Sequence, residues 1–148
     1  MSKVDELVQK GLKTLDDGDT AEALRYFEAA LDSGAAGNPL VECSYAVCLA
    51  AERQEYERAI GICQDAITRE PGKSIHYLNL GRIYIYADRK KEAIRTFRDG
   101  LLFERNPRIV DAMNRLGWRN LPAIQSLGRE HPLNRFLGKL FRSRRRRR

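Results

Sequence analysis

A segment with the same arrangement of small and large residues occurs three times in this chain, and this internal repeat limits the fold more than any other feature. The small residue near the middle of each copy is Ala23, Ala59 or Ala93, so consecutive copies are 36 and 34 residues apart. One unit of this length cannot bury its apolar face alone, and at least three units must stack to form a core. The repeat therefore predicts a solenoid.

Helix-boundary residues divide each copy into two helices. Gly18 is typical of the end of a helix, and Asp19 with Glu22 three residues later forms a capping box for the helix that follows. These signals predict an all-α fold. We expect helices near residues 3–16, 20–33, 39–52, 56–69, 74–87, 90–105 and 109–120, and a final amphipathic helix at about 132–143.

The third copy carries the fullest sequence motif. It reads Tyr77-x2-Leu80-Gly81-x2-Tyr84 and continues with Ala93-x3-Phe97. This motif resembles the 34-residue unit of the tetratricopeptide-repeat (TPR) family, in which each unit is a hairpin of two helices. The resemblance extends over roughly residues 3–120. It implies a helical-hairpin solenoid of three repeats plus a partial fourth helix, with a basic amphipathic cap helix at the C-terminal side.

The other copies depart from the family pattern at a few positions. The first copy keeps Gly11 and Phe27, whereas the second has Val47 in place of the small first-helix residue and Cys63 in place of the aromatic one. A partial fourth copy opens with Met113-x2-Leu116-Gly117. We therefore expect a TPR domain at residues 1–122, a capping or interaction helix at 123–143, and a basic tail at 144–148 that lacks order.

The TPR resemblance also implies a binding surface, because in that family the first helices of successive repeats line a concave groove. That groove holds a peptide or a helix of a partner protein. In this chain the predicted partner-binding residues are Val8, Leu12, Tyr45, Cys48, Leu78, Asn79, Arg82, Ile85 and Tyr86. Most of them are apolar, which favours an amphipathic helix or an apolar extended peptide, with Asn79 and Arg82 as polar guides. Alternatively, some of these residues belong to the core, or the C-terminal segment covers them.

TPR proteins that bind the C-terminal Glu-Glu-Val-Asp of chaperones use Lys, Asn and Arg side chains on this face. The corresponding positions here are Val8, Leu12, Tyr45, Ile75 and Asn79, of which only Asn79 matches in polarity. The resemblance does not extend to that carboxylate clamp. The predicted function is therefore a protein-binding adaptor or scaffold with an apolar groove.

Charge is distributed unevenly along the chain. Residues 1–107 contain 15 Lys and Arg against 18 Asp and Glu, a net charge of −3. Residues 108–148 contain 12 against 2, a net charge of +10. This asymmetry suggests that the C-terminal segment meets an anionic surface or the acidic body of the protein itself.

The C-terminal segment combines an apolar stripe with basic residues. The stripe consists of Leu133, Phe136, Leu137, Leu140 and Phe141, at helical spacing. Three roles remain open: a helix that caps the solenoid, a helix that lies on an anionic membrane, or contact with nucleic-acid phosphates. The residues predicted to meet an anionic surface are Arg135, Lys139, Arg142, Arg144, Arg145, Arg146, Arg147 and Arg148.

The remaining residues give no indication of catalysis, and we expect no enzyme, cofactor, metal or small-molecule substrate. His76 and His131 are isolated from one another, and two such histidines rarely form a metal or catalytic site. The N-terminal residues do not form a signal segment, and no apolar run is long enough to span a membrane. We therefore expect Cys43, Cys48 and Cys63 to be reduced thiols in a cytoplasmic protein, peripheral to a membrane if the tail binds lipid.

Overall fold

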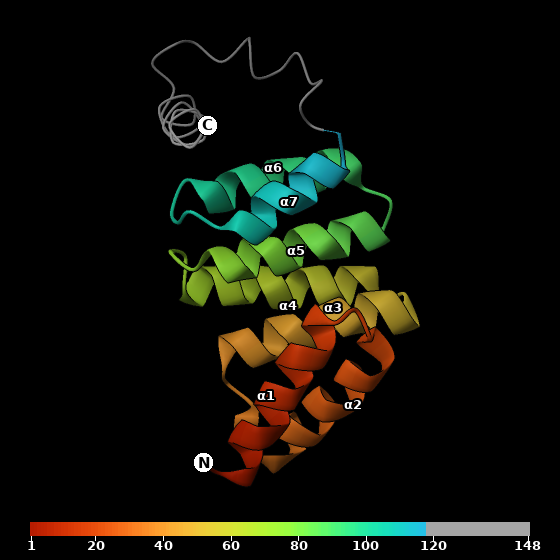
Figure 1. Cartoon of the computed structure of the whole chain (residues 1–148), viewed down its shortest axis with the longest axis vertical. Helices are drawn as coiled ribbons and strands as arrows, with labels where there is room; N and C mark the ends of the chain where they lie inside the picture. The colour runs from red at the N-terminus through yellow and green to blue at the C-terminus, as the bar shows by residue number, and fades with distance from the viewer. Residues whose placement is uncertain (118–148) are drawn as a thin grey trace, which may run out of the picture.

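The computed structural model describes residues 1–117 and forms a stack of helical hairpins, with the N-terminus at one end and α7 at the other (Figure 1). The described residues contain no strand. The predicted helix at 132–143 and the predicted segments at 123–143 and 144–148 lie outside this part of the chain. The helices are α1 (Lys3–Asp16), α2 (Thr20–Ala30), α3 (Pro39–Arg53), α4 (Tyr56–Arg69), α5 (Ser74–Tyr86), α6 (Lys90–Leu101) and α7 (Pro107–Arg115), with a short π-helical turn, η1 (Leu31–Ala35), after α2.

Local sequence determines where these helices begin. The Asp19 side chain accepts a hydrogen bond of 3.0 Å from the backbone N–H of Glu22, which is one half of the predicted capping box. The other half does not form, because the backbone N–H of Asp19 donates to the Thr14 carbonyl and the Glu22 carboxylate accepts from the Tyr26 hydroxyl. Asn38 and Asn106 cap α3 and α7 in the same way, and each is followed by a proline in the first turn. Such a proline lacks only an N–H that would have no partner in the helix.

Three predicted helices are shorter in the structure than expected. The helix predicted at 20–33 changes to η1 after Ala30, and Gly34 then adopts a φ of 112°. The helix predicted at 90–105 ends at Leu101. The helix predicted at 109–120 begins earlier, at Pro107, and ends at Arg115, shortly before Gly117 with a φ of 73°. Glycine adopts this left-handed conformation without the steric cost that a side chain would bring.

The first and third hairpins close around a glycine and a phenylalanine ring. Phe27 and Phe97 are fully buried, and each ring lies against a glycine of the preceding helix. A Cβ atom added at Gly11 would lie 2.8 Å from the Phe27 ring, and one added at Gly81 would lie 2.1 Å from the Phe97 ring. The helices of these two hairpins can approach only because the glycines lack side chains.

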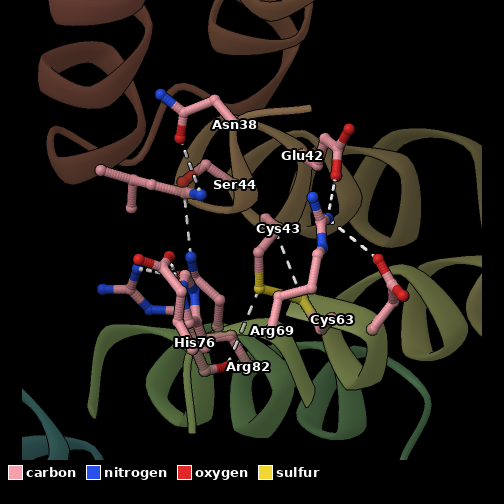
Figure 2. Close-up of a disulfide and its surroundings, with 12 residues drawn as sticks. Asn38, Glu42, Cys43, Ser44, Cys63, Arg69, His76 and Arg82 are labelled. Atoms are coloured by element: carbon pink, nitrogen blue, oxygen red, sulfur yellow. Dashed lines mark hydrogen bonds and ion pairs between the residues drawn. A yellow bond between two sulfur atoms is a disulfide. The ribbon is translucent and has the colours of Figure 1, made fainter. Parts of the chain in front are cut away.

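The second hairpin is closed by a disulfide bond. Cys43 of α3 and Cys63 of α4 are fully buried and joined to one another (Figure 2). Cys48 is a buried free thiol. The prediction of three reduced thiols is therefore wrong for this pair. The repeat placed both cysteines at core positions but gave no information on whether their sulfur atoms meet.

The first helix of each hairpin packs against both helices of the hairpin before it. Helix α3 contacts both α2 and α5, and α4 contacts α5. Figure 1 shows α3 to α7 lying across the long axis in successive layers, with the α1–α2 hairpin set at an angle to them. The core is continuous along the stack and includes Leu49, Leu78, Ile83 and Leu101.

Candidate functional site

The inner face of the stack is identified by a contact between its first and last helices. Arg108, in the first turn of α7, forms an ion pair with Asp16, the last residue of α1. These residues are 92 positions apart in sequence, and two hairpins separate their helices in the stack. Helices so far apart can meet only on the concave side of a curved array. The first helices α1, α3, α5 and α7 therefore share the inner face.

Arg82 of α5 is a half-buried cation on this face. Its guanidinium donates a weak hydrogen bond of 3.4 Å to the Asn79 side chain, which in turn donates one of 3.4 Å to Ser44 of α3. Burial lowers the pKa of Arg82, and the positive charges of Arg108 and Arg115 lower it further, whereas Asp16 opposes them. Arg82 forms no ion pair with any carboxylate of residues 1–117.

Exposed apolar side chains lie next to this cation. Ile85 is 39% exposed and Tyr86 is 45% exposed, both within about one helical turn of Arg82. Burial raises the pKa of the Tyr86 hydroxyl, and the nearby Arg82 charge lowers it in part. Val8 and Leu12 of α1 are partly buried and pack against the core. The inner face thus combines apolar surface with a positive charge.

Three of the predicted binding residues lie in the core. Cys48, Leu78 and Asn79 have at most 1% of their surface exposed, so a ligand on the inner face does not touch them in this arrangement. The prediction that they form part of the binding surface is wrong, and the alternative of core packing applies to them. The reason is that α5 packs against α3, α4 and α6, which leaves little of its circumference open.

Tyr45 lines a pocket that the sequence did not predict. The pocket has a volume of about 620 Å³, lies at the end of α2 and between α3 and α4, and does not include α5 or α7. A helix has two flanks beside its buried stripe, and the repeat pattern does not tell which flank Tyr45 occupies. Whether Tyr45 also contributes to the inner face stays a prediction. The other lining residues are Leu31, Ala36, Glu42, Arg58, Gly61, Ile62 and Asp65.

Three charged residues of the inner face were missed in the sequence. The charges of Arg108 and Arg115 lower the pKa of Arg82, and the charge of Asp16 raises it. Extending the repeat alignment could have found two of them, because Asp16 and Arg115 align with Tyr86 and Asn79 of the third repeat. Arg108 had no such signal, since it precedes the aligned part of the fourth repeat. The predicted basic residues from Arg135 to Arg148 lie outside the described residues.

The part of the chain that the structure describes shows neither a metal-ligand cluster nor a membrane-spanning helix. It contains no group of three or more His, Cys, Asp or Glu side chains placed to hold a metal ion. Within the same residues, no helix combines the length and the apolar character that crossing a membrane requires.

Comparison with solved structures identifies the architecture. The chain is similar to the TPR domain of P58(IPK), with a TM-score of 0.58 and 16% sequence identity. The match covers 86% of this chain and 35% of the P58(IPK) chain, so this chain spans only about a third of the length of that protein domain. It is also similar to the second TPR domain of human RPAP3, solved with the HSP70 peptide SGPTIEEVD, with a TM-score of 0.53 and 20% identity over 77% of this chain and 98% of that one. No family model and no curated protein matches the sequence. The chain therefore has the TPR fold, as its repeat predicted.

Proposed function

We propose that this protein is an adaptor whose inner face binds a peptide or a helix of a partner protein. The observation that carries the proposal is the exposed apolar surface at Ile85 and Tyr86, on the face where the first helices meet. An exposed Tyr is the type of residue that anchors interfaces, because it buries a large area and offers a polar group. The RPAP3 domain with this fold was solved with a bound peptide, which supports the same use of the fold here.

Binding would proceed by burial of apolar side chains on a preformed surface. Val8 and Leu12 of α1 and Ile85 and Tyr86 of α5 offer apolar contact, while Arg82 orients the bound segment by its charge. An amphipathic helix or an extended segment with alternate apolar residues fits such a surface. This mechanism requires no catalytic group, and we propose that the protein is not an enzyme.

A capture experiment with matched variants tests this function. Full-length protein is immobilised, proteins retained from a native lysate are identified, and the double variant Ile85→Asp/Tyr86→Asp is compared with Leu102→Asp. Leu102 is a fair control because it is 45% exposed but follows α6, a second helix. We expect a discrete partner to be lost from the double variant and kept by the control. Retention of the same partners by both variants would reject the inner face as the binding surface.

We also propose, as a second candidate function, that the basic C-terminal segment binds an anionic surface. The net charge of +10 over residues 108–148 supports it. Binding to vesicles that contain phosphatidylserine, but not to neutral vesicles, would indicate a membrane partner. Loss of capture after nuclease treatment would indicate nucleic acid instead. If binding depends neither on anionic lipid nor on nucleic acid, this second function is rejected and only the adaptor function stands.

Cytoplasmic location is part of the proposal and rests on the sequence. The Cys43–Cys63 disulfide stands against it, because disulfides are typical of oxidising compartments. Trapping the thiols by alkylation during cell lysis, followed by mass spectrometry, would show which state the cell maintains.

A further inference from the structure

The pocket that Tyr45 lines is an apolar surface without a partner among the described residues. Its volume is about 620 Å³, and it lies where α3 and α4 meet the end of α2. Leu31, Tyr45 and Ile62 line it, and each keeps part of its surface exposed. The volume falls within the range of ligand pockets in proteins, about 300–1,000 Å³. Covering such apolar surface is favourable, because it removes the surface from water.

The equivalent positions of the next repeat are closed. Tyr45 and Ile62 correspond to Asn79 and Thr96, which lie 34 residues further along the chain. Asn79 is 1% exposed and Thr96 is 8% exposed, whereas Tyr45 and Ile62 are only half-buried. The first hairpin is set at an angle to the others (Figure 1), and the pocket lies at the junction of this hairpin with the second. The pocket is therefore particular to this junction and is not repeated at the next one.

Gly61 keeps the pocket open on the side of α4. The equivalent residues of the first and third repeats are Arg25 and Arg95, both exposed. Apart from the neighbouring backbone of its own helix, no atom lies within 4 Å of a Cβ added at Gly61. Because Gly61 itself lines the pocket, a long side chain at this position would fill part of it. The second repeat thus lacks the side chain that would occupy this space.

The helices around the pocket carry an excess of negative charge. Residues 20–70, which contain α2, α3 and α4, have 4 Lys and Arg against 9 Asp and Glu, a net charge of −5. Residues 71–107, which contain α5 and α6, have 8 against 4, a net charge of +4. A basic segment is therefore attracted to the part of the stack that forms the pocket and repelled by the third repeat.

We infer that this pocket receives the C-terminal segment of the same chain, with the apolar stripe of residues 133–141 in the pocket. The stripe lies outside the described residues and follows from the sequence, which places five large apolar residues at helical spacing. Arg135, Lys139 and Arg142 accompany it and would face the carboxylates around the pocket. An amphipathic helix in an apolar groove is a common mode of recognition. The inference goes beyond the proposed adaptor function and does not depend on it.

The chain is long enough to make this contact. Helix α4 packs on α5, α5 on α6, and α6 on α7. Since packed helices lie about 8–10 Å apart, these three steps place α4 at most about 30 Å from α7. Fifteen residues, 118–132, separate the last described residue from the stripe, and an extended chain of this length spans up to about 50 Å. One chain can therefore supply both the pocket and its occupant.

Photo-crosslinking in the full-length protein tests the contact. The protein carries p-benzoylphenylalanine in place of Phe136 and is irradiated at several concentrations, and cross-linked peptides are identified by mass spectrometry. The experiment is repeated with Gly61→Arg, which gives the pocket the residue that the other two repeats have at this position. Gly72→Arg is the matched control, because Gly72 is an exposed glycine outside the pocket with no atom within 4 Å of its added Cβ. Thermal melting verifies that each variant is folded.

The expected result is a cross-link within one chain, from position 136 to residues of α3 or α4 that line the pocket. Its yield should not depend on protein concentration. Gly61→Arg should lower this yield by about tenfold or more, while Gly72→Arg should leave it unchanged. The site of the cross-link gives the answer even if Gly61→Arg fails to fold.

Three outcomes would overturn the inference. Cross-links to α6 or α7 would place the segment at the end of the stack, and cross-links between chains, with a yield that rises with concentration, would show an intermolecular contact. No cross-link to the pocket, or a yield that a folded Gly61→Arg variant leaves unchanged, would show that the pocket does not hold the segment. None of these results bears on capture of a partner at Ile85 and Tyr86, so the proposed function is tested separately.

Discussion

The second hairpin packs its helices differently from the first and the third, although all three have the same fold. At the position where the first and third hairpins have Gly11 and Gly81, the second has Val47. The second helix contributes a buried phenylalanine in the outer two hairpins and a small residue, Cys63, in the middle one. In the second hairpin the larger side chain of this pair therefore lies on the first helix, whereas in the other two hairpins it lies on the second helix.

A covalent bond accompanies this exchange of volume. Cys43 occupies the position of Leu7 and Tyr77, and with Cys63 opposite it the two sulfur atoms meet (Figure 2). The comparison shows that a helical hairpin can be closed by an aromatic ring on a glycine or by a disulfide between two small residues. The two designs should respond differently to substitution and to reduction.

Removing the aromatic ring should produce the largest effect. Phe97→Ala leaves a cavity in the third hairpin, because the ring is fully buried against Gly81. We expect a loss of about 3–5 kcal/mol in the free energy of unfolding, measured by urea denaturation of the full chain. Val47→Ala in the second hairpin should cost less, since fewer atoms are removed. A loss below about 1 kcal/mol for Phe97→Ala would show that the ring does not hold the hairpin together.

Reduction should destabilise only the second hairpin. The disulfide joins residues with a sequence separation of 20. By restricting the unfolded chain, a cross-link over a loop of this length stabilises the folded state by about 3 kcal/mol. A phosphine reductant should lower the free energy of unfolding of the wild type by about this amount. The double variant Cys43→Ala/Cys63→Ala should not respond to the reductant. Equal stability of the wild type with and without reductant, with the bond verified by intact mass, would contradict the expectation.

Replacing a glycine by alanine should change the stability by an amount that depends on how closely other atoms approach the added methyl group. Gly81→Ala would force a Cβ to within 2.1 Å of the Phe97 ring, and overpacking of this kind costs about 1–3 kcal/mol or more. Gly11→Ala should cost less, because the corresponding distance is 2.8 Å. Gly61→Ala in α4 is the control. Apart from the neighbouring backbone of its own helix, no atom lies within 4 Å of its added Cβ, so the better helix propensity should stabilise the protein by about 0.5–1 kcal/mol. Melting temperatures in a different order would refute this ranking.

The free cysteine of the second hairpin should show the smallest effect. Burial, with a contribution from Glu52, raises the pKa of the Cys48 thiol from 9.0 to about 12. Because the folded pKa is above the unfolded value, the stability that the thiol contributes is present below about pH 9 and declines as the pH rises toward 12. Folded protein should therefore resist iodoacetamide at pH 8, whereas unfolded protein should react at Cys48. Rapid labelling of the folded chain, measured by mass spectrometry, would show that the thiol is accessible.

Local sequence patterns were sufficient to predict the hairpins. The bounds of α1 and α4 match their predicted ranges, and α3 and α5 differ by one residue. Capping residues and glycines act through their immediate neighbours in the chain, so their effect can be inferred without a structure. The same patterns were less reliable at the ends of α2, α6 and α7, where packing and turn geometry decide how far a helix continues.

The candidate site could be predicted only in part. In the structure Ile85 and Tyr86 of α5 are exposed and Arg82 is half-buried, so each keeps surface that a partner could reach. It could not separate them from Leu78 and Asn79, which follow the same helical periodicity but are covered by neighbouring helices. Whether any of these residues binds a partner stays a prediction.

The sequence by itself determined the repeat, its helices and the complementary small and large residues, because each depends on contacts within one hairpin. Only the tertiary structure decided which residues of the first helices are covered, that Cys43 meets Cys63, and that α1 reaches α7 through Asp16 and Arg108. The physical reason is that a solenoid curves by a small rotation at each repeat. These rotations add up over the stack, so contacts between distant repeats depend on packing angles that no single repeat encodes.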